Sequence, residues 1–257
     1  MRPLAAVTGA SSGIGAVFAR ALAKRGFDLL LIARRRDKLE ALADETGGEV
    51  LVADLTKDDD LRRVEERLSH AENLEVLVNN AGFGAGGTFS KIDIEAQDQM
   101  HRLHIIATLR LTHAALVGMV ARRKGGIINV SSVAAFLTNP GAIGYCSTKT
   151  WINSFTEGLY LELKAGGSPV RVQALCPGFV YSEFHDTAGM DRKKLAPPAW
   201  WLDAEMVVTE SLAGLDRGQL FVIPSVRYRA LVWVLNRIPR VVKRAILVKA
   251  SRRQGRM

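Results

Sequence analysis

Thr8-Gly9-Ala10-Ser11-Ser12-Gly13-Ile14-Gly15 is the stretch that decides the fold of this 257-residue chain. The apolar run 4–7 before it suits a buried parallel strand, and residues 17–22 after it keep helical spacing up to Gly26. Glycine at such a turn lets the backbone approach a ligand closely, and the new helix N-terminus offers free N–H groups and a positive dipole end. The turn is therefore either a pyrophosphate site or a tight structural turn between strand and helix.

Strand-like and helix-like segments alternate along the rest of the chain. The further strands are expected at 29–32, 50–53, 76–78, 127–130, 170–175 and 220–223, and the helices at about 37–45, 58–71, 94–122 and 146–164, with a looser segment after residue 175. This succession predicts an α/β fold, a Rossmann-type doubly wound parallel sheet of about seven strands with helices on both faces. Ligands of such sheets bind at the carboxyl ends of the strands.

Composition limits the classes of protein that the chain can be. A hydrophobic content of 48% is ample for one α/β domain. From the first residues we expect no secretory signal, and no apolar run approaches the ~20 residues that a membrane helix needs. Two cysteines, Cys146 and Cys176, argue against a disulfide framework. We therefore expect a cytoplasmic protein whose two thiols are buried.

The net charge of +9 is concentrated at the C-terminus. Residues 227–257 hold ten Lys and Arg and no acidic residue, so the other 226 residues are close to neutral. The basicity therefore does not indicate nucleic-acid binding by the domain. We expect a catalytic domain over 1–226 and a basic amphipathic extension over 227–257 that is not independent of it. The extension suits an anionic membrane surface, another subunit, or an acidic carrier protein or coenzyme A ester.

Ala33-Arg34-Arg35-Arg36 follows the second strand, where dinucleotide-binding folds read the adenosine ribose. A carboxylate there accepts a hydrogen bond from the 2′-OH of NAD, whereas an arginine pairs with the 2′-phosphate of NADP. The absence of an acid here favours NADP(H), bound through Arg34 and Arg35. After the third strand, Asp54-Leu55 either meets the adenine edge or caps the next helix.

Polar groups also follow the fourth and fifth strands. Asn79-Asn80-Ala81-Gly82 can brace the sheet and leave room for a ribose. Tyr145 and Lys149 stand one helical turn apart on the same face, so the ammonium is expected to lower the phenol pKa from its ordinary value of ~10. Ser132 ends the fifth strand, which brings its hydroxyl towards the same place. The three side chains can therefore meet in one cleft, where the hydroxyl and the phenol would stabilise the alkoxide that forms when hydride reaches a carbonyl.

The motifs jointly resemble the classical short-chain dehydrogenase/reductase (SDR) family over about residues 3–226. The resemblance implies that Tyr145 is the general acid in ketone reduction, that Lys149 lowers its pKa and holds the nicotinamide ribose, and that Ser132 orients the carbonyl. It also implies that nicotinamide packs on the segment 177–182, where Ser182 replaces a more usual threonine. The implied cofactor-binding residues are Gly9, Ser11, Ser12, Gly13, Ile14, Gly15, Arg34, Arg35, Asp54, Leu55, Asn80, Ala81, Gly82, Tyr145, Lys149, Pro177, Gly178, Val180 and Ser182. No metal site is implied.

One position departs from the family pattern. The family usually places an asparagine in the middle of the long helix before the fifth strand, where it helps to hold a water in a proton relay to the lysine. The corresponding residue here is His104. Histidine can also hold a water and carry a proton, so His104 is either a catalytic member of an altered relay or an ordinary helix residue.

The segment 183–206 resembles the substrate lid of the family and contains Trp200-Trp201, which favours a hydrophobic substrate, although paired tryptophans also pack into cores. The expected function is NADPH-dependent reduction of a hydrophobic carbonyl, of the lipid, 3-oxoacyl or steroid class. Two alternatives stay open: an NADP-dependent alcohol dehydrogenase, and a non-catalytic dinucleotide-binding scaffold that acts through its basic tail. The family's usual assembly implies a homodimer or homotetramer.

Overall fold

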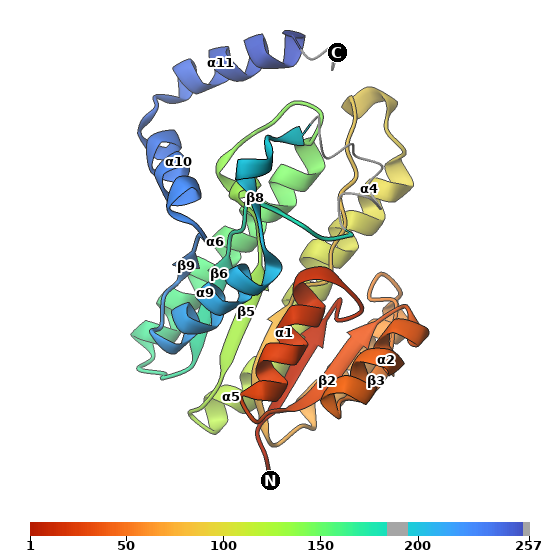
Figure 1. The fold of residues 1–257 in the computed structure, drawn as a ribbon. Helices are drawn as coiled ribbons and strands as arrows, with labels where there is room; N and C mark the ends of the chain where they lie inside the picture. The colour runs from red at the N-terminus through yellow and green to blue at the C-terminus, as the bar shows by residue number, and fades with distance from the viewer. Residues whose placement is uncertain (184–194, 254–257) are drawn as a thin grey trace.

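Seven parallel strands form the central sheet of the computed structural model, which describes residues 1–183 and 195–253 (Figure 1). The strands lie in the order β3-β2-β1-β4-β5-β6-β9. Their bounds are β1 (Leu4–Thr8), β2 (Asp28–Ala33), β3 (Glu49–Val52), β4 (Leu74–Asn79), β5 (Gly126–Val130), β6 (Arg171–Leu175) and β9 (Phe221–Val222). All seven strands expected from the sequence are present, so the prediction of a Rossmann-type parallel sheet is confirmed.

Helices cover both faces of the sheet because alternate strand residues point to opposite sides. In β1, Ala5 and Val7 belong to one hydrophobic core, while Leu4 and Ala6 belong to the other. The first core is closed by α1 (Gly13–Lys24), α2 (Arg36–Thr46) and α9 (Ala204–Asp216). The second is closed by α3 (Asp58–Ser69), α5 (Thr108–Ala121) and α6 (Ile143–Ala165). Burial on both faces explains why the strands read as continuous apolar runs.

The long helix expected over 94–122 consists of three pieces. It begins as α4 (Ile94–His101), continues as a π-helical stretch η2 (Arg102–Ala107), and ends as α5. By length and composition, the run Ile94–Ala121 could also cross a membrane, which the sequence analysis did not expect. Here its α5 part packs against α3 and β4, with Leu111, Ala115 and Met119 buried in the second core. The run therefore serves as a core helix of the α/β fold.

The segment after β6 is more ordered than the sequence suggested. Short strands β7 (Phe179–Val180) and β8 (Trp201–Leu202) pair in parallel as a separate two-stranded sheet, and α9 then packs against α1. The remaining short elements are the 3-10 helices η1 (Phe89–Lys91), η3 (Val133–Phe136) and η4 (Pro198–Trp200). The expected lid 183–206 lies partly outside the described residues, and its described end forms η4, β8 and the start of α9.

Two helices follow the last strand. The first, α10 (Val226–Arg237), buries Tyr228 and Val232 against the body of the protein. The second, α11 (Arg240–Arg253), extends away from the sheet at the C-terminal end of the chain (Figure 1). The basic extension therefore consists of two helices: α10 packs on the domain, and α11 stands apart from it.

Candidate functional site

The order in which strands are added to the sheet reverses between β1 and β4, which are neighbours in space but far apart in the chain. The chain leaves β1 towards α1 on one face and leaves β4 towards α5 on the other. Ligands of open α/β sheets bind in the crevice at the carboxyl ends of strands at such a switch point. The residues that end β1, β4, β5 and β6 are the ones that the sequence analysis singled out.

The turn after β1 has the geometry of an anion site. Gly9 and Gly13 have φ values of +66° and +55°, in the left-handed region that disfavours other residues. A Cβ at Gly15 would lie 2.3 Å from the Gly9 carbonyl oxygen, so the turn and α1 approach too closely for a side chain. Ser12, the N-cap residue of α1, makes no side-chain cap, which leaves the N–H groups of the first turn for an anion. These features fit a pyrophosphate, and Ile14 packs on the first core below.

The Asn79–Gly82 segment braces the strands as the sequence predicted. Thr8 Oγ1 accepts hydrogen bonds from the backbone N–H groups of Asn80 (2.9 Å) and Ala81 (3.0 Å). The Asn80 side chain donates in turn to the Thr8 carbonyl at 2.9 Å. These bonds join the ends of β1 and β4 and fix the floor of the predicted ribose site. Gly82 lies against His104, whose Nε2 would be 2.8 Å from a Cβ at that position.

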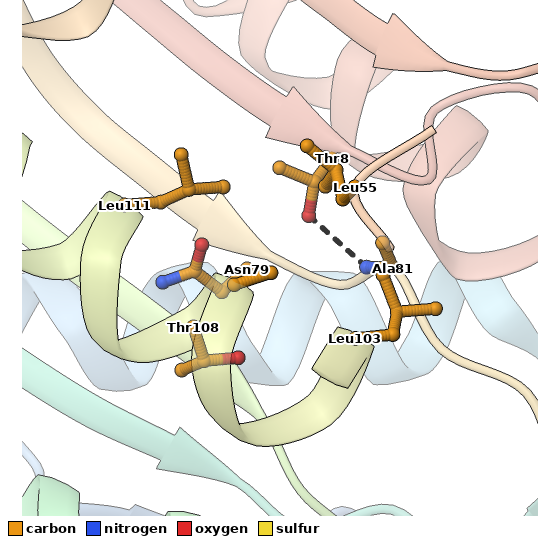
Figure 2. Close-up of a pocket in the computed structure, with 8 residues that line it drawn as sticks. Thr8, Leu55, Asn79, Ala81, Leu103, Thr108 and Leu111 are labelled. Atoms are coloured by element: carbon orange, nitrogen blue, oxygen red, sulfur yellow. Dashed lines mark hydrogen bonds between the residues drawn. The ribbon is translucent and has the colours of Figure 1, made fainter. Parts of the chain in front are cut away.

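A small cavity lies behind this brace, between the ends of β1 and β4 and the start of α5 (Figure 2). Its volume of about 10 Å³ matches a single water and is far below the ~300 Å³ of a typical ligand pocket. Leu55, expected at the adenine edge, lines this cavity as a buried side chain. Asp54 Oδ1 accepts from the N–H and hydroxyl of Thr56 at 3.1 and 2.8 Å, which makes a turn before α3. The N-cap of α3 is Lys57 and has no side-chain cap, so Asp54 does not cap that helix.

The three arginines after β2 have different surroundings. Arg35 donates to Ser11 Oγ (3.0 Å) and Ser12 Oγ (2.8 Å) in the glycine-rich turn, whereas Arg34 is exposed. Lys38, one turn into α2, lies near Arg35 because Glu183 pairs with both cations, at 2.7 and 2.6 Å. Arg35 and Lys38 therefore meet through Glu183 beside the glycine-rich turn. The sequence analysis named Arg34 and Arg35 for the 2′-phosphate and did not name Lys38.

Ser132, Tyr145 and Lys149 come together at the ends of β5 and α6, as predicted. A hydrogen bond joins the Ser132 and Tyr145 side chains. Lys149 Nζ lies 5.7 Å from the centroid of the Tyr145 ring and donates to the Val130 carbonyl at 2.8 Å. Ser132 Oγ is held in place by the Ala134 N–H, from which it accepts at 3.1 Å. The cluster thus presents a hydroxyl, a phenol and an ammonium in one place.

Burial controls the protonation of this cluster. It raises the pKa of Tyr145 to about 12, and the hydrogen bond from Ser132 offsets only part of that rise. It lowers the pKa of Lys149 to about 8, because the charged ammonium has lost its water. The expectation that Lys149 brings the Tyr145 pKa below its ordinary value is therefore wrong for the chain by itself. At neutral pH Tyr145 is a protonated phenol that can donate.

His104 occupies the π-helical stretch with both ring nitrogens engaged. Its Nε2 accepts from the Phe83 N–H at 3.2 Å, and its Nδ1 lies 2.9 Å from Thr148 Oγ1. Because the Thr148 hydroxyl donates to the Tyr145 carbonyl at 2.9 Å, we assign the proton of the imidazole to Nδ1. Burial, together with the charge of Lys149, holds the pKa of His104 well below its usual range. The contacts therefore favour a neutral bracing histidine over a member of a proton relay.

Tyr228 is a site residue that the sequence analysis missed. A Cβ at Gly178 would lie 1.9 Å from the Tyr228 ring, so the ring packs directly on the segment predicted to hold nicotinamide. The Tyr228 hydroxyl accepts from the Phe179 N–H at 3.0 Å and donates to the Trp200 carbonyl at 2.7 Å. A signal for it existed in the sequence, because Tyr228, Leu231, Val232 and Leu235 keep the spacing of one buried helix face.

The rest of the predicted nicotinamide segment is ordered by these contacts. The Pro177 carbonyl accepts from the Val133 N–H at 3.0 Å, and Val180 is buried in β7. Ser182 approaches the glycine-rich turn, with its Cβ 3.0 Å from where a Cβ on Gly13 would be. The segment 177–182 thus runs from the Ser132 side of the site to the turn after β1.

The tryptophans of the expected lid pack against aromatic neighbours. The Trp201 ring stacks on Tyr181 at 5.1 Å and lies 5.4 Å from Phe179, while Trp200 meets Tyr228 edge-on at 5.3 Å. Trp201 is 8% exposed, whereas Tyr181 is 50% exposed. The tryptophans are therefore mainly structural, and Tyr181 presents the open face of the group.

Neither metal nor disulfide chemistry is found in residues 1–183 and 195–253. They contain no group of three or more His, Cys, Asp or Glu that could hold a metal ion. Cys146 and Cys176 are free and buried, as expected.

Comparisons with known proteins agree with this geometry. The family model described as short chain dehydrogenase matches residues 3–193. The very-long-chain 3-oxoacyl-CoA reductase of Anas platyrhynchos is 30% identical over 259 residues, covering 96% of this chain and 80% of that protein.

Two solved structures extend the comparison. A short-chain dehydrogenase from Sphingobium yanoikuyae in complex with NADPH is 35% identical, with a TM-score of 0.81 over 93% of this chain and 97% of that one. The bulky-bulky ketone specific alcohol dehydrogenase from Comamonas testosteroni is 32% identical, with a TM-score of 0.76 over 93% and 95% of the two chains. Structural neighbours carry NADPH in some cases and NAD in others.

Proposed function

The chain belongs to the short-chain dehydrogenase family, and from that membership we propose that it is an NADPH-dependent reductase of hydrophobic ketones. The observation that carries the proposal is the meeting of Ser132, Tyr145 and Lys149 with a phenol that is protonated at neutral pH. A general acid must hold its proton before the reaction, so a pKa of about 12 suits reduction better than oxidation.

Each side chain of the cluster has a role in this chemistry. The cofactor supplies hydride to the carbonyl carbon when it is bound. Tyr145 gives its proton to the carbonyl oxygen, and Ser132 donates a hydrogen bond to the same oxygen and orients it. The ammonium of Lys149 stabilises the phenolate that Tyr145 becomes after the transfer. His104 and Thr148 hold the backbone around Tyr145 in position.

The preference for NADP(H) rests on Arg35 and Lys38. Arg35 reaches the hydroxyls of Ser11 and Ser12 beside the pyrophosphate turn, and the three residues directly after β2 are all arginines, where NAD-binding folds place an acid for the ribose 2′-OH. Two cations at this position suit a phosphate with its two negative charges. A relative complexed with NADPH supports the same choice.

A hydrophobic substrate is supported by the aromatic group next to the predicted nicotinamide segment. Phe179, Tyr181 and Trp201 form this group, and Tyr181 exposes half of its surface. One relative is specific for bulky ketones and another is a reductase of very-long-chain 3-oxoacyl-CoA. We therefore include lipid-like 3-oxoacyl compounds in the proposed substrate class.

The proposal is tested by NADPH oxidation with purified protein against ketones and 3-oxoacyl thioesters of increasing chain length. We expect kcat/KM to rise with chain length, because each buried CH₂ contributes ~0.8 kcal/mol. Faster turnover in the reverse direction, with NADP and the matching alcohols at neutral pH, would favour the oxidative alternative. Tight NADPH binding without turnover on any compound would favour a non-catalytic scaffold.

We also propose that the C-terminal helices bind an anionic membrane surface. Trp233, Val241 and Ile246 expose 57%, 75% and 54% of their surface, next to Lys and Arg side chains. The Arg237 guanidinium lies 3.6 Å from the centroid of the Trp233 ring, a pairing of aromatic and cation that suits a headgroup region. Each Lys or Arg near an anionic surface contributes ~1 kcal/mol. A second copy of this chain fits less well, because its tail carries the same charge.

The helix pattern makes charge the main contribution to this binding. Val241 and Ile246 lie about 140° apart around α11, and Lys249 falls between them at about 80°, so a basic residue interrupts the apolar face. The expected amphipathic pattern is therefore incomplete. Closer to the body, Arg229 pairs with Glu210 at 3.0 Å, which ties the start of α10 to the domain.

Vesicle flotation tests the membrane proposal. Full-length protein is expected to float with vesicles that contain anionic lipid and to stay behind with neutral phosphatidylcholine. A triple variant Lys243→Gln, Arg244→Gln and Lys249→Gln should lose that binding, while Lys24→Gln, Lys57→Gln and Arg62→Gln, with the same change in charge on the body, should keep it. Absence of flotation by the wild type, or equal loss in both variants, would contradict the proposal.

A further inference from the structure

Glu183 places a carboxylate on the two cations of the predicted 2′-phosphate site. Its Oε2 lies 2.7 Å from Arg35 Nη1, and its Oε1 lies 2.6 Å from Lys38 Nζ. Each oxygen therefore takes a different cation, and the carboxylate bridges the start of α2. Neither the cofactor motifs nor the proposed reaction assigns any role to this residue.

The bridge formed by Glu183, Arg35 and Lys38 contacts the glycine-rich turn. The Arg35 guanidinium that binds Glu183 also donates to Ser11 and Ser12. Ser182, the residue before Glu183, packs against Gly13 at the start of α1. The carboxylate is thus delivered to the turn by the end of the nicotinamide segment, from 148 positions further along the chain than Arg35.

The charges at this point are unbalanced. Lys38 and Arg35 hold the pKa of Glu183 at about 2, so the carboxylate is ionised at every physiological pH. One negative charge then faces two positive ones, and the three side chains are each about 40% exposed. A phosphate with two negative charges would match the cations better than the carboxylate does, and it would be repelled by a carboxylate that remained in place.

We propose that Glu183 is a specificity-determining residue whose carboxylate competes with the cofactor's 2′-phosphate for Arg35 and Lys38; the inference rests on the NADP(H) preference proposed above. The competition lowers the affinity for NADPH, since each cation must leave Glu183 before it can bind phosphate. NADH has no 2′-phosphate and does not enter this competition. Glu183 therefore narrows the difference in affinity between the two cofactors.

The experiment is calorimetric titration of wild type and Glu183→Gln with NADPH, NADH and adenosine 2′,5′-bisphosphate. The glutamine keeps the shape of the side chain and removes its charge. Half-exposed ion pairs are weak, so removing the competing carboxylate should lower the Kd for NADPH by about 3- to 10-fold. The Kd for the bisphosphate should fall by the same factor, and the Kd for NADH should change less than about twofold.

Glu45→Gln is the matched control. Glu45 pairs with Arg20 at 2.6 Å on the outer side of α1 and α2, with a similar exposure to that of the Glu183 pairs. It makes the same change in net charge away from the predicted phosphate position, so it should leave all three affinities unchanged. Glu183→Asp, which keeps the charge, should stay nearer to wild type than Glu183→Gln does.

The outcomes separate the inference from the function on which it rests. The absence of an NADPH preference in both wild type and Glu183→Gln would refute the cofactor assignment and this inference with it. A clear NADPH preference that Glu183→Gln leaves unchanged, or weakens, would refute only the inference, since Glu183 would then orient the cations for phosphate. Equal tightening of NADPH and NADH would also overturn it, because that result reports a general charge effect.

Discussion

Two groups of charged and polar side chains lie at opposite ends of the predicted cofactor site, and different forces set their protonation. Around Glu183 the side chains are half exposed, and the neighbouring cations lower the carboxyl pKa to about 2. Around Tyr145 the lysine is buried and the phenol is half-buried, and loss of water raises the phenol pKa to about 12 and lowers the Lys149 pKa to about 8. Charge pairing dominates at the first group, and burial dominates at the second.

The difference has a functional meaning. A half-exposed ion pair is weak and can exchange partners, which suits a place where a phosphate must bind and leave. A phenol whose surroundings raise its pKa keeps its proton until a reacting oxygen takes it, which suits a general acid. Changes at the buried group should therefore affect the rate strongly, and changes at the exposed group should affect cofactor affinity moderately.

The largest effect is expected for Tyr145→Phe. This change removes the proposed proton donor and keeps the ring, so kcat for ketone reduction should fall about 10²- to 10⁴-fold. The Kd for NADPH, measured by fluorescence titration, should stay within about threefold of wild type. Tyr160→Phe, on the same helix α6 but away from the cluster, is the matched control and should retain activity. Retained reduction by Tyr145→Phe would remove this residue from the mechanism.

The pH dependence of reduction should report the buried lysine. Lys149 has a pKa lowered to about 8, so its charged form is present below that pH and is lost as pH rises above it. Tyr145, with a pKa of about 12, keeps its proton throughout this range. We therefore expect kcat/KM, which reflects the free enzyme, to be level below about pH 7 and to fall up to tenfold per unit above about pH 8.

The matching measurement is a kcat/KM profile with a saturable ketone between neutral and alkaline pH. A fall that begins near pH 6.5 would indicate a titrating histidine and restore His104 to the relay, against its contacts with Phe83 and Thr148. A profile level to pH 10 would show that burial does not lower the Lys149 pKa. The Tyr145 group would then no longer differ from the Glu183 group in the force that sets its protonation.

Arg35→Ala and Arg34→Ala test the exposed group. Arg35 touches the glycine-rich turn and Arg34 does not, although they are adjacent in the sequence. Loss of charge-assisted hydrogen bonds costs ~1.5–3 kcal/mol, so Arg35→Ala should raise the Kd for NADPH at least ~10-fold and leave NADH nearly unchanged. Arg34→Ala should change either Kd less than about threefold. Equal effects of the two variants on NADPH would contradict the assignment to Arg35.

The sequence was most informative where function depends on local spacing. The turn 8–15 and the pair Tyr145 and Lys149 are each defined within one or two helical turns, and the structure places them as expected. The seven strands could also be predicted from local pattern, because burial on both faces makes a strand a short apolar run. Local pattern was therefore sufficient to predict the fold and the meeting of Ser132, Tyr145 and Lys149.

The sequence was less informative where tertiary contacts decide. Whether Arg34 or Arg35 reaches the turn depends on the direction of each side chain at the start of α2. The Tyr145 pKa depends on how deeply the folded chain buries the phenol, and the Glu183 bridge joins residues 148 positions apart. The π-helical turn at His104 likewise could not be predicted from the sequence, because it depends on contacts with Phe83 and with Thr148 of α6.

The smallest effect is expected for Tyr228→Phe. The Tyr228 hydroxyl differs from both groups compared above, because it is neutral and largely buried. The change keeps the ring on Gly178 and removes the bonds to the Phe179 N–H and the Trp200 carbonyl. Each lost bond costs ~0.5–1.5 kcal/mol, so the free energy of unfolding should fall by about 1–3 kcal/mol. Because the ring still supports the nicotinamide segment, KM for NADPH should rise by no more than a few-fold and kcat should be nearly unchanged. Urea unfolding together with steady-state kinetics measures both. A large loss of kcat with normal stability would mean that the hydroxyl positions the reacting groups themselves, and that hydrogen bonding by a neutral group, as well as burial and charge, controls this site.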